Sequence, residues 1–135
     1  MSSGPGVRVL DSWGLMAFLE DEPAAERMEE IIASAQEEGE LLVTSVNLAE
    51  VWYSTARSRS EAEADAAVAR LVMLGIKVVD ADWRLAREAA RLKAKRKIAL
   101  GDSFAAALAN LRGAEVVTGD PEFKQLEDEV RVLWV

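Results

Sequence analysis

Short apolar runs alternate along the chain with longer stretches in which apolar residues recur at helical spacing. The apolar runs predict strands at 7–10, 41–44, 76–79, 115–118 and 130–134. The periodic stretches predict helices at 13–20, 24–38, 46–57, 60–74, 83–95 and 101–112, with a short helix after Pro121. Strands that alternate with helices predict βαβ units, a mostly parallel central sheet and helices on both faces.

Capping and breaking residues set the expected ends of these helices. Ser12 and Ser45 are candidate N-caps, and Pro23 suits the first turn of the helix that follows it. Gly39 and Gly75 are expected to end the two helices that precede them. In parallel sheets ligands bind beyond the carboxyl ends of the strands, so the polar residues that follow each strand are the candidates for function.

Length and composition indicate one globular unit. The 135 residues are 50% hydrophobic and 30% charged, which predicts a single domain over 1–135 with residues 1–6 as a flexible lead. The start carries no signal-like pattern, and no apolar run approaches the length of a membrane helix. We therefore expect a soluble, cytoplasmic protein.

The chain contains no histidine and no cysteine. Their absence excludes disulfides, thiolate metal sites, cysteine nucleophiles and hydrolases that depend on a Ser-His pair. Catalysis by this chain would have to use carboxylates, hydroxyls, lysines or a metal ion.

Four carboxylates lie where predicted strands meet predicted helices or one turn inside a helix: Asp11, Glu50, Asp102 and Asp120. Hard cations need several oxygen ligands at one place, so these acids form a candidate site for a divalent metal. Each has a structural alternative. Asp11 and Asp102 suit helix N-caps, Asp120 suits a turn before Pro121, and Glu50 could lie on a solvated helix surface.

The motifs around these acids resemble one family. Val-Leu-Asp-Ser, Asn-Leu-Ala-Glu-Val, Leu-Gly-Asp-Ser-Phe-Ala-Ala-Ala and Val-Val-Thr-Gly-Asp-Pro-Glu-Phe occur in this order between Val7 and Val135. The ordered set resembles the PIN-domain nucleases, most of all the VapC-type toxins of prokaryotic toxin–antitoxin pairs. The resemblance implies a three-layer α/β/α sandwich and an acidic pocket that holds one or two Mg²⁺ or Mn²⁺ ions for RNA hydrolysis.

The family's acidic residues, which bind metal and take part in catalysis, match Asp11, Glu50, Asp102 and Asp120 of this sequence. It places Thr118 as a polar helper, with Ser12 as a further candidate for hydrogen bonding to a carboxylate or a phosphate. Glu122 stands where many members have an aspartate. The family also implies a homodimer and a cognate antitoxin whose basic tail enters the acidic pocket.

The net charge of −8 opposes binding of a polyanion. One basic cluster precedes Asp102 and is a candidate rim for RNA phosphates, although a solvated helix end explains it equally well. Its members are Arg91, Lys93, Lys95, Arg96 and Lys97. The tryptophans at 13, 52, 83 and 134 are expected in the core.

Three other classes of protein compete with the nuclease. A haloacid-dehalogenase-type phosphatase needs a second acid where this chain has Trp13, and a receiver domain needs an acidic pair after the first strand. A non-catalytic PIN-like module that docks a basic partner peptide in the acidic pocket also remains open.

Overall fold

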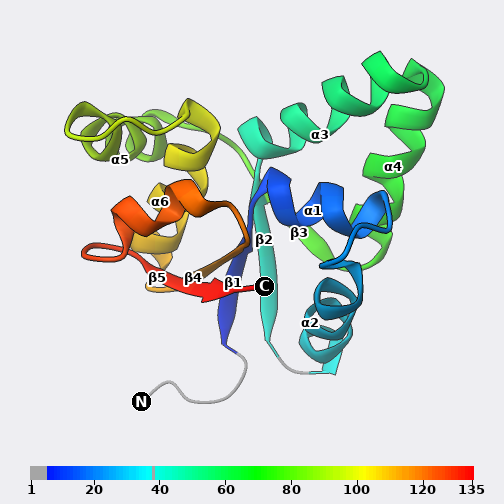
Figure 1. Ribbon diagram of the computed structural model, residues 1–135, viewed down its shortest axis with the longest axis horizontal. Coiled ribbons are helices and arrows are strands. Elements are labelled where there is room, and N and C mark those ends of the chain that lie inside the picture. Colours follow the sequence, from blue (N-terminus) through cyan, green and yellow to red (C-terminus); the bar gives the residue numbers. More distant parts are fainter. Residues whose placement is uncertain (1–5, 38) are drawn as a thin grey trace.

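The computed structural model describes residues 6–37 and 39–135, so most of the lead expected at 1–6 lies outside the described residues. The described residues form one five-stranded sheet in the order β3-β2-β1-β4-β5, and every strand pair is parallel (Figure 1). The strands are β1 (Val7–Leu10), β2 (Glu40–Thr44), β3 (Ile76–Val79), β4 (Glu115–Thr118) and β5 (Arg131–Trp134). All lie within one residue of the predicted runs.

The helices also match the predicted stretches to within two residues. They are α1 (Ser12–Leu19), α2 (Ala25–Glu37), α3 (Ser45–Ser58), α4 (Glu61–Met73), α5 (Trp83–Ala94) and α6 (Leu100–Arg112), with the 3₁₀ helix η1 (Pro121–Leu126) before β5. Within the described part of the chain, no helix combines the length and the apolar character needed to cross a membrane.

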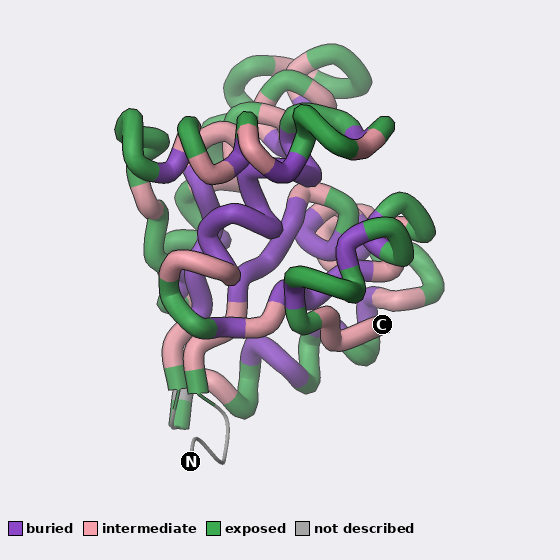
Figure 2. Tube along the Cα trace, turned by 90° about the vertical axis from the view of Figure 1, so that its left-hand side faces the viewer, coloured by how far each residue is buried: buried purple, intermediate pink, exposed green. Residues whose placement is uncertain are grey.

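Alternating strand residues supply two separate cores, one on each face of the sheet. Val9 and Val116 pack with α5, α6 and η1, whereas Leu10 and Val117 pack with α1, α2 and α4. Both faces are covered, which is why most strand positions are apolar. Figure 1 shows α5 and α6 on one side of the strands and α2 and α4 on the other. Figure 2 shows the buried segments in the middle of the molecule and the exposed segments mostly around them. The predicted three-layer α/β/α sandwich is confirmed.

Two predicted N-caps are wrong by one residue. Thr44, not Ser45, caps α3 through a bond from the Asn47 amide, and Asp11, not Ser12, caps α1. In each case the last strand residue or the one after it already has the extended backbone that a cap requires. The serines are left inside the first turn, where their hydroxyls contact other elements.

The core assignment of the tryptophans is also wrong. Trp13 and Trp83 are exposed, with relative accessibilities of 37% and 74%, and Trp52 and Trp134 are only half-buried. The indole nitrogens of the latter two donate to Asp65 and Glu127, respectively. Small and aliphatic residues fill the two cores instead.

The strand order places a topological switch point between β1 and β4. The chain proceeds from β1 through β2 to β3 on one side, and then crosses to β4 and β5 on the other. The loops leave β1 and β4 in opposite directions at this point, so a crevice opens at the carboxyl ends of these two strands. Asp11 and Thr118 lie there, as the register that pairs Leu10 with Val117 requires.

Candidate active site

Asp11 follows β1 directly and is completely buried. Its Oδ1 accepts a hydrogen bond from the Gly14 amide at 2.8 Å, which caps α1. Its Oδ2 accepts a bond from the Thr118 hydroxyl at 2.5 Å. The capping alternative for Asp11 is therefore confirmed, and the same carboxylate also joins the ends of β1 and β4.

Thr118 continues this connection into the next loop. Its Oγ1 accepts a hydrogen bond from the Asp120 amide at 3.0 Å, while Asp120 Oδ1 accepts one from the Glu122 amide at 2.9 Å. Asp120 is thus the N-cap of η1, which confirms its turn alternative. These bonds hold the Asp120 carboxylate beside Asp11.

Asp102 is not the N-cap that the sequence allowed. The cap position of α6 belongs to Ala99, for which the described structure has no side-chain capping bond. Asp102 lies in the first turn, buried, and its carboxyl group is hydrogen-bonded to that of Glu122. Glu122 Oε1 also accepts a bond from the Ala99 amide at 3.1 Å, so Glu122 joins η1 to the start of α6.

Glu50 reaches the same region from α3. Its Oε1 accepts hydrogen bonds from the Ser12 hydroxyl at 2.9 Å and from the Asn47 amide group at 3.2 Å. The carboxylate lies against Gly101, where any Cβ would collide with it. Glu50 is half-buried and points inward, so the solvated-surface alternative for this residue is wrong.

Asn47 is a site residue that the sequence reasoning did not single out. It is fully buried, and its Nδ2 donates both to Glu50 and to the Gly101 carbonyl at 2.9 Å. Its Oδ1 accepts from the Thr44 hydroxyl at 2.6 Å. The available signal was its position one turn before Glu50, on the same helix face. Asn47 therefore fixes Glu50 relative to both β2 and α6.

Burial and mutual repulsion disturb the acidity of this group. Burial raises the pKa of Asp11 to about 7, an effect that hydrogen bonds from Thr118 and Gly14 reduce and the charge of Asp120 reinforces. Burial raises the pKa of Asp102 to about 8, and Glu122, Asp120 and Asp11 act in the same direction. The hydrogen bond from Asp102 lowers the pKa of Glu122. The hydrogen bond between the two carboxyl groups therefore shifts their pKa values in opposite directions.

One cavity of about 380 Å³ brings most of these acids together. Its lining comes from α1, α3, α6 and η1 with their flanking loops, and comprises Ser12, Trp13, Met16, Glu22, Glu50, Tyr53, Ser54, Ala99, Asp102, Asp120 and Glu122. Asp11 is enclosed next to the cavity, close enough to Asp120 for the two charges to interact. The sequence-predicted acids thus converge from four separate segments.

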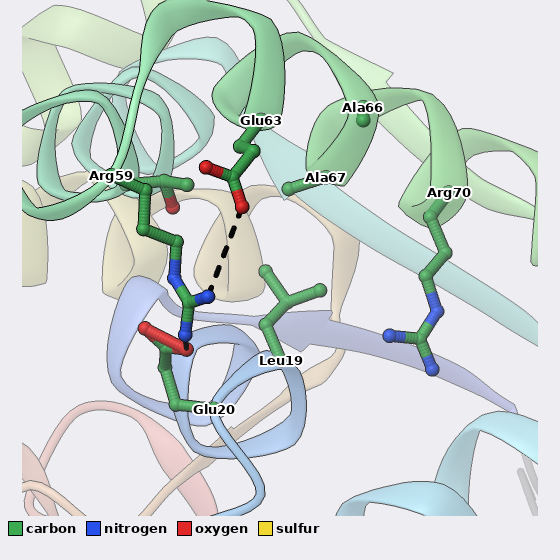
Figure 3. A pocket seen from close by; sticks show the side chains of 8 residues that line it. Leu19, Glu20, Arg59, Glu63, Ala66, Ala67 and Arg70 are labelled. Carbon is green, nitrogen blue, oxygen red and sulfur yellow. Dashed lines mark hydrogen bonds and ion pairs between the residues drawn. The ribbon is translucent and has the colours of Figure 1, made fainter.

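A second cavity, of about 280 Å³, lies between α1, α3 and α4 (Figure 3). Its carboxylates are already paired: Arg59 contacts Glu20 at 2.9 Å and Glu63 at 3.8 Å. Arg70, the other cation of this cavity, stacks over the Phe18 ring at 4.8 Å. Because its acids are neutralised, this cavity lacks the uncompensated carboxylates that a metal-dependent site needs.

The basic cluster before α6 divides into two kinds of residue. Arg91 and Arg96 pair with Glu129 at 2.9 and 2.5 Å, and Lys93 donates to the Ile98 carbonyl at 2.5 Å. These three side chains hold the end of α5 against neighbouring segments. Lys95 and Lys97 are exposed.

The chemical nature of the oxygen groups around the cavity suits a hard divalent cation. It consists of carboxylate oxygens with hydroxyls nearby, which Mg²⁺ and Mn²⁺ prefer. As the side chains stand, no three acidic groups among the described residues form a cluster that could hold an ion. Asp102 is hydrogen-bonded to Glu122, and Glu50 accepts hydrogen bonds from Ser12 and Asn47. An ion that bound here would compete with these hydrogen bonds.

Comparison with known proteins agrees with this fold. The family model of the PIN domain matches residues 8–129. The chain belongs to the PIN domain family. Among curated proteins, no sequence match is found.

Several solved structures share the fold. VapBC2 from Rickettsia felis bound to a promoter DNA fragment aligns with a TM-score of 0.75 at 16% identity, covering 96% of this chain and 98% of that one. DNA-bound VapBC from Salmonella typhimurium aligns with a TM-score of 0.75 at 20% identity, covering 96% of this chain and 98% of that one. Mycobacterium tuberculosis VapC20, a sarcin-ricin loop cleaving toxin, aligns with a TM-score of 0.73 at 17% identity, covering 88% of this chain and 94% of that one.

Asn47→Ala is expected to impair metal binding as well as stability. The change removes the side-chain donor to the Gly101 carbonyl and the acceptor of the Thr44 hydroxyl proton, and it releases Glu50. The expected cost is about 1–3 kcal/mol in unfolding free energy. Affinity for Mn²⁺ should fall about tenfold, because Glu50 loses its orientation. Calorimetric titration measures the affinity and thermal unfolding the stability. The matched control is Asn110→Ala, which removes a 3.2 Å bond to Glu88 away from the cavity and should leave Mn²⁺ affinity unchanged.

Stability without metal is expected to fall as the pH rises. Asp11 and Asp102 have folded-state pKa values of about 7 and 8, above the ordinary 3.8. Their protonation therefore favours the fold at low pH, and this contribution disappears as the pH rises through those values. In EDTA, the melting temperature should drop between pH 6 and 9 by on the order of 5 °C. Mn²⁺ should restore it at pH 9 and have little effect at pH 6.

The variant Asp102→Asn should show a much smaller pH dependence, because it resembles the protonated acid. Glu29→Gln, at an exposed position on α2, is the control and should behave like the wild type. With no histidine or cysteine in the chain, few other groups titrate in this range. A melting temperature that is flat from pH 6 to 9 in the wild type contradicts the assignment.

Proposed function

We propose that this protein is a metal-dependent endoribonuclease and the toxin component of a toxin–antitoxin pair. The observation that carries the proposal is the convergence of Glu50, Asp102, Asp120 and Glu122 on one cavity, with Asp11 beside it, at the switch point of the sheet. Membership of the PIN domain family supports nuclease chemistry at this place.

The proposed ligands of Mg²⁺ or Mn²⁺, as one or two ions, are Asp11, Glu50, Asp102 and Asp120. An ion held there would supply Lewis acidity, which would activate a water for in-line attack on phosphorus and offset the charge of the leaving oxygen.

The chain's own groups prepare this reaction. Thr118 orients Asp11, Ser12 and Asn47 orient Glu50, and Glu122 positions Asp102 through the hydrogen bond between their carboxyl groups. Burial of these acids concentrates negative charge that only a cation, or a proton, offsets.

The substrate and partners rest on the relatives. VapC20 is a toxin that cleaves the sarcin-ricin loop. Similar structures also include a toxin–antitoxin complex from Klebsiella pneumoniae and VapBC-5 from Mycobacterium tuberculosis, a member of a family of toxin–antitoxin systems. We extend this to a cognate antitoxin whose basic tail occupies the acidic cavity, a cytoplasmic location and a homodimer.

A second function is favoured by one observation. No three acids of the described chain are arranged to hold an ion. This favours a module without catalytic activity, whose acidic cavity docks a basic peptide. Cleavage of RNA in the presence of Mg²⁺ or Mn²⁺ separates the two functions, since a docking module has no activity with any metal.

Asp11→Asn and Asp102→Asn are expected to abolish EDTA-sensitive RNA cleavage, with a reduction on the order of 100-fold or more. Each removes a metal-binding charge, and each keeps the shape of the carboxyl group, so both proteins should fold. Circular dichroism checks the folding, and Glu29→Gln is the control that retains activity.

The RNA ends provide an independent check of the mechanism. Attack by water predicts 5′-phosphate and 3′-hydroxyl ends, because the 2′-hydroxyl is not the nucleophile. Ends with a 2′,3′-cyclic phosphate, or full activity of either aspartate variant, would contradict the proposal.

Lys95 and Lys97 are the members of the basic cluster that remain available to RNA phosphates. The double change Lys95→Glu and Lys97→Glu should weaken RNA binding and lower the slope of log affinity against log salt by about 0.7 for each phosphate that is no longer neutralised. Filter binding over a range of salt concentrations measures both quantities. The control is Arg27→Glu with Lys77→Glu, which changes the net charge equally on α2 and β3. Equal weakening by both pairs would refute a specific rim.

A further inference from the structure

Trp13 forms a wall of the acidic cavity. It lies in the first turn of α1, two residues after Asp11, and more than a third of the residue is exposed. Its six-membered ring lies so close over Gly119 that any Cβ there would collide with it. The absence of a side chain at Gly119, between Thr118 and Asp120, therefore allows the indole to lie against the active-site loop.

A separate cavity of about 350 Å³ adjoins Trp13. Its lining is apolar except for one carboxylate, and comprises Trp13, Ala17, Glu22, Pro23, Ala24 and Val135. Trp13 and Glu22 also line the acidic cavity, so these two residues separate one cavity from the other. The volume lies in the range of small-molecule sites.

The backbone holds this wall in place. Asp21 adopts a positive φ of 53° in the turn between α1 and α2. The Glu22 amide donates to the Ala17 carbonyl at 2.9 Å, and the Glu22 carbonyl accepts from the Ala25 amide at 2.8 Å. Glu22 is thus anchored through both its amide and its carbonyl, while its carboxylate stays exposed at the rim.

The chemistry of the cavity between Trp13 and Glu22 suits a nucleobase and opposes a phosphate. An exposed indole offers a stacking surface to an unpaired base, and stacking does not depend on the charge of the protein. The Glu22 carboxylate accepts hydrogen bonds from N–H groups at a base edge and repels phosphate oxygens. A protein with net charge −8 gains from such a contact, because electrostatics do not attract its substrate.

We propose that the cavity between Trp13 and Glu22 is a base subsite. In it, a base next to the scissile phosphate of single-stranded RNA stacks on Trp13 while that phosphate occupies the acidic cavity. The proposal rests on the ribonuclease function above and adds a residue that binds substrate. It makes Trp13 a determinant of substrate affinity rather than of the chemical step.

Binding of a labelled short single-stranded RNA to the full chain, measured by fluorescence anisotropy with Ca²⁺ in place of Mg²⁺, tests the subsite. Trp13→Leu should weaken binding about tenfold, whereas Trp13→Phe, which keeps an aromatic ring, should stay within about threefold. Ala24→Leu, which fills the cavity without altering the indole, should weaken binding like Trp13→Leu. The control Trp83→Leu changes an exposed tryptophan that lines neither cavity and should bind as the wild type does.

A second probe separates base stacking from backbone binding. An oligonucleotide of the same length with the bases replaced by hydrogen should bind the wild type and Trp13→Leu equally. Cleavage with Mn²⁺ should show a raised KM and a nearly unchanged kcat for Trp13→Leu.

The possible failures are distinguishable. RNA binding that depends on Trp13 without any cleavage refutes the ribonuclease and keeps the base subsite. Cleavage with equal KM for the wild type and Trp13→Leu refutes the subsite and keeps the ribonuclease, and the cavity is then left to an apolar segment of a protein partner. No preference of the wild type for the base-containing oligonucleotide also overturns the proposal.

Discussion

The hydrogen bond from Thr118 to Asp11 is the interaction on which the site depends. It joins the ends of the two strands that flank the switch point, and it places a carboxylate where no part of it is exposed. The same carboxylate caps α1, so the start of that helix, with Ser12 and Trp13, is fixed to the sheet. Burying a carboxylate without partners would cost several kcal/mol. Among the described residues no buried side-chain polar atom lacks a partner, and here Thr118 and Gly14 supply both bonds.

Two hydrogen-bond networks meet at the cavity, and they differ in kind. Glu50 is held by neutral donors, the Ser12 hydroxyl and the Asn47 amide group. Asp102 is held by another acid, Glu122, and their hydrogen bond raises the pKa of Asp102 and lowers that of Glu122. In the proposed function a divalent ion would take the place of the proton in this pair, since it compensates the charge of more than one oxygen at once. The first network therefore gives the site its shape, and the second carries the acid pair whose pKa values are shifted.

The fold could be predicted from the sequence because each signal that defines it is local. Short apolar runs predict strands, and in the structure their residues alternate between the two cores. Glycines predict helix ends, and Gly39, Gly75 and Gly113 do lie at helix ends with positive φ. Cap identity was less predictable, because Thr44 and Ser45, or Asp11 and Ser12, are adjacent residues with similar capping ability. Asn47 could have been singled out only by its position one turn before Glu50, because its bond to Gly101 joins segments far apart in the chain. The Arg96–Glu129 pair and the exposed tryptophans could not be predicted, because they too depend on such distant interactions.

Glycine positions show how tightly the carboxylates and their surroundings are packed. Gly101 gives Glu50 its place beside α6, and Gly119 gives Trp13 its place over the loop that carries Asp120. In both cases the space of the missing Cβ is occupied by a functional side chain from another segment, so the two glycines act through space rather than through backbone conformation. Both stand directly before an acid, Asp102 or Asp120, and the close approach that they allow brings α3 and α1 against those acids. Each Gly-Asp pair therefore supplies a carboxylate and the space for a neighbouring side chain beside it. That side chain is Glu50 at Gly101-Asp102 and Trp13 at Gly119-Asp120.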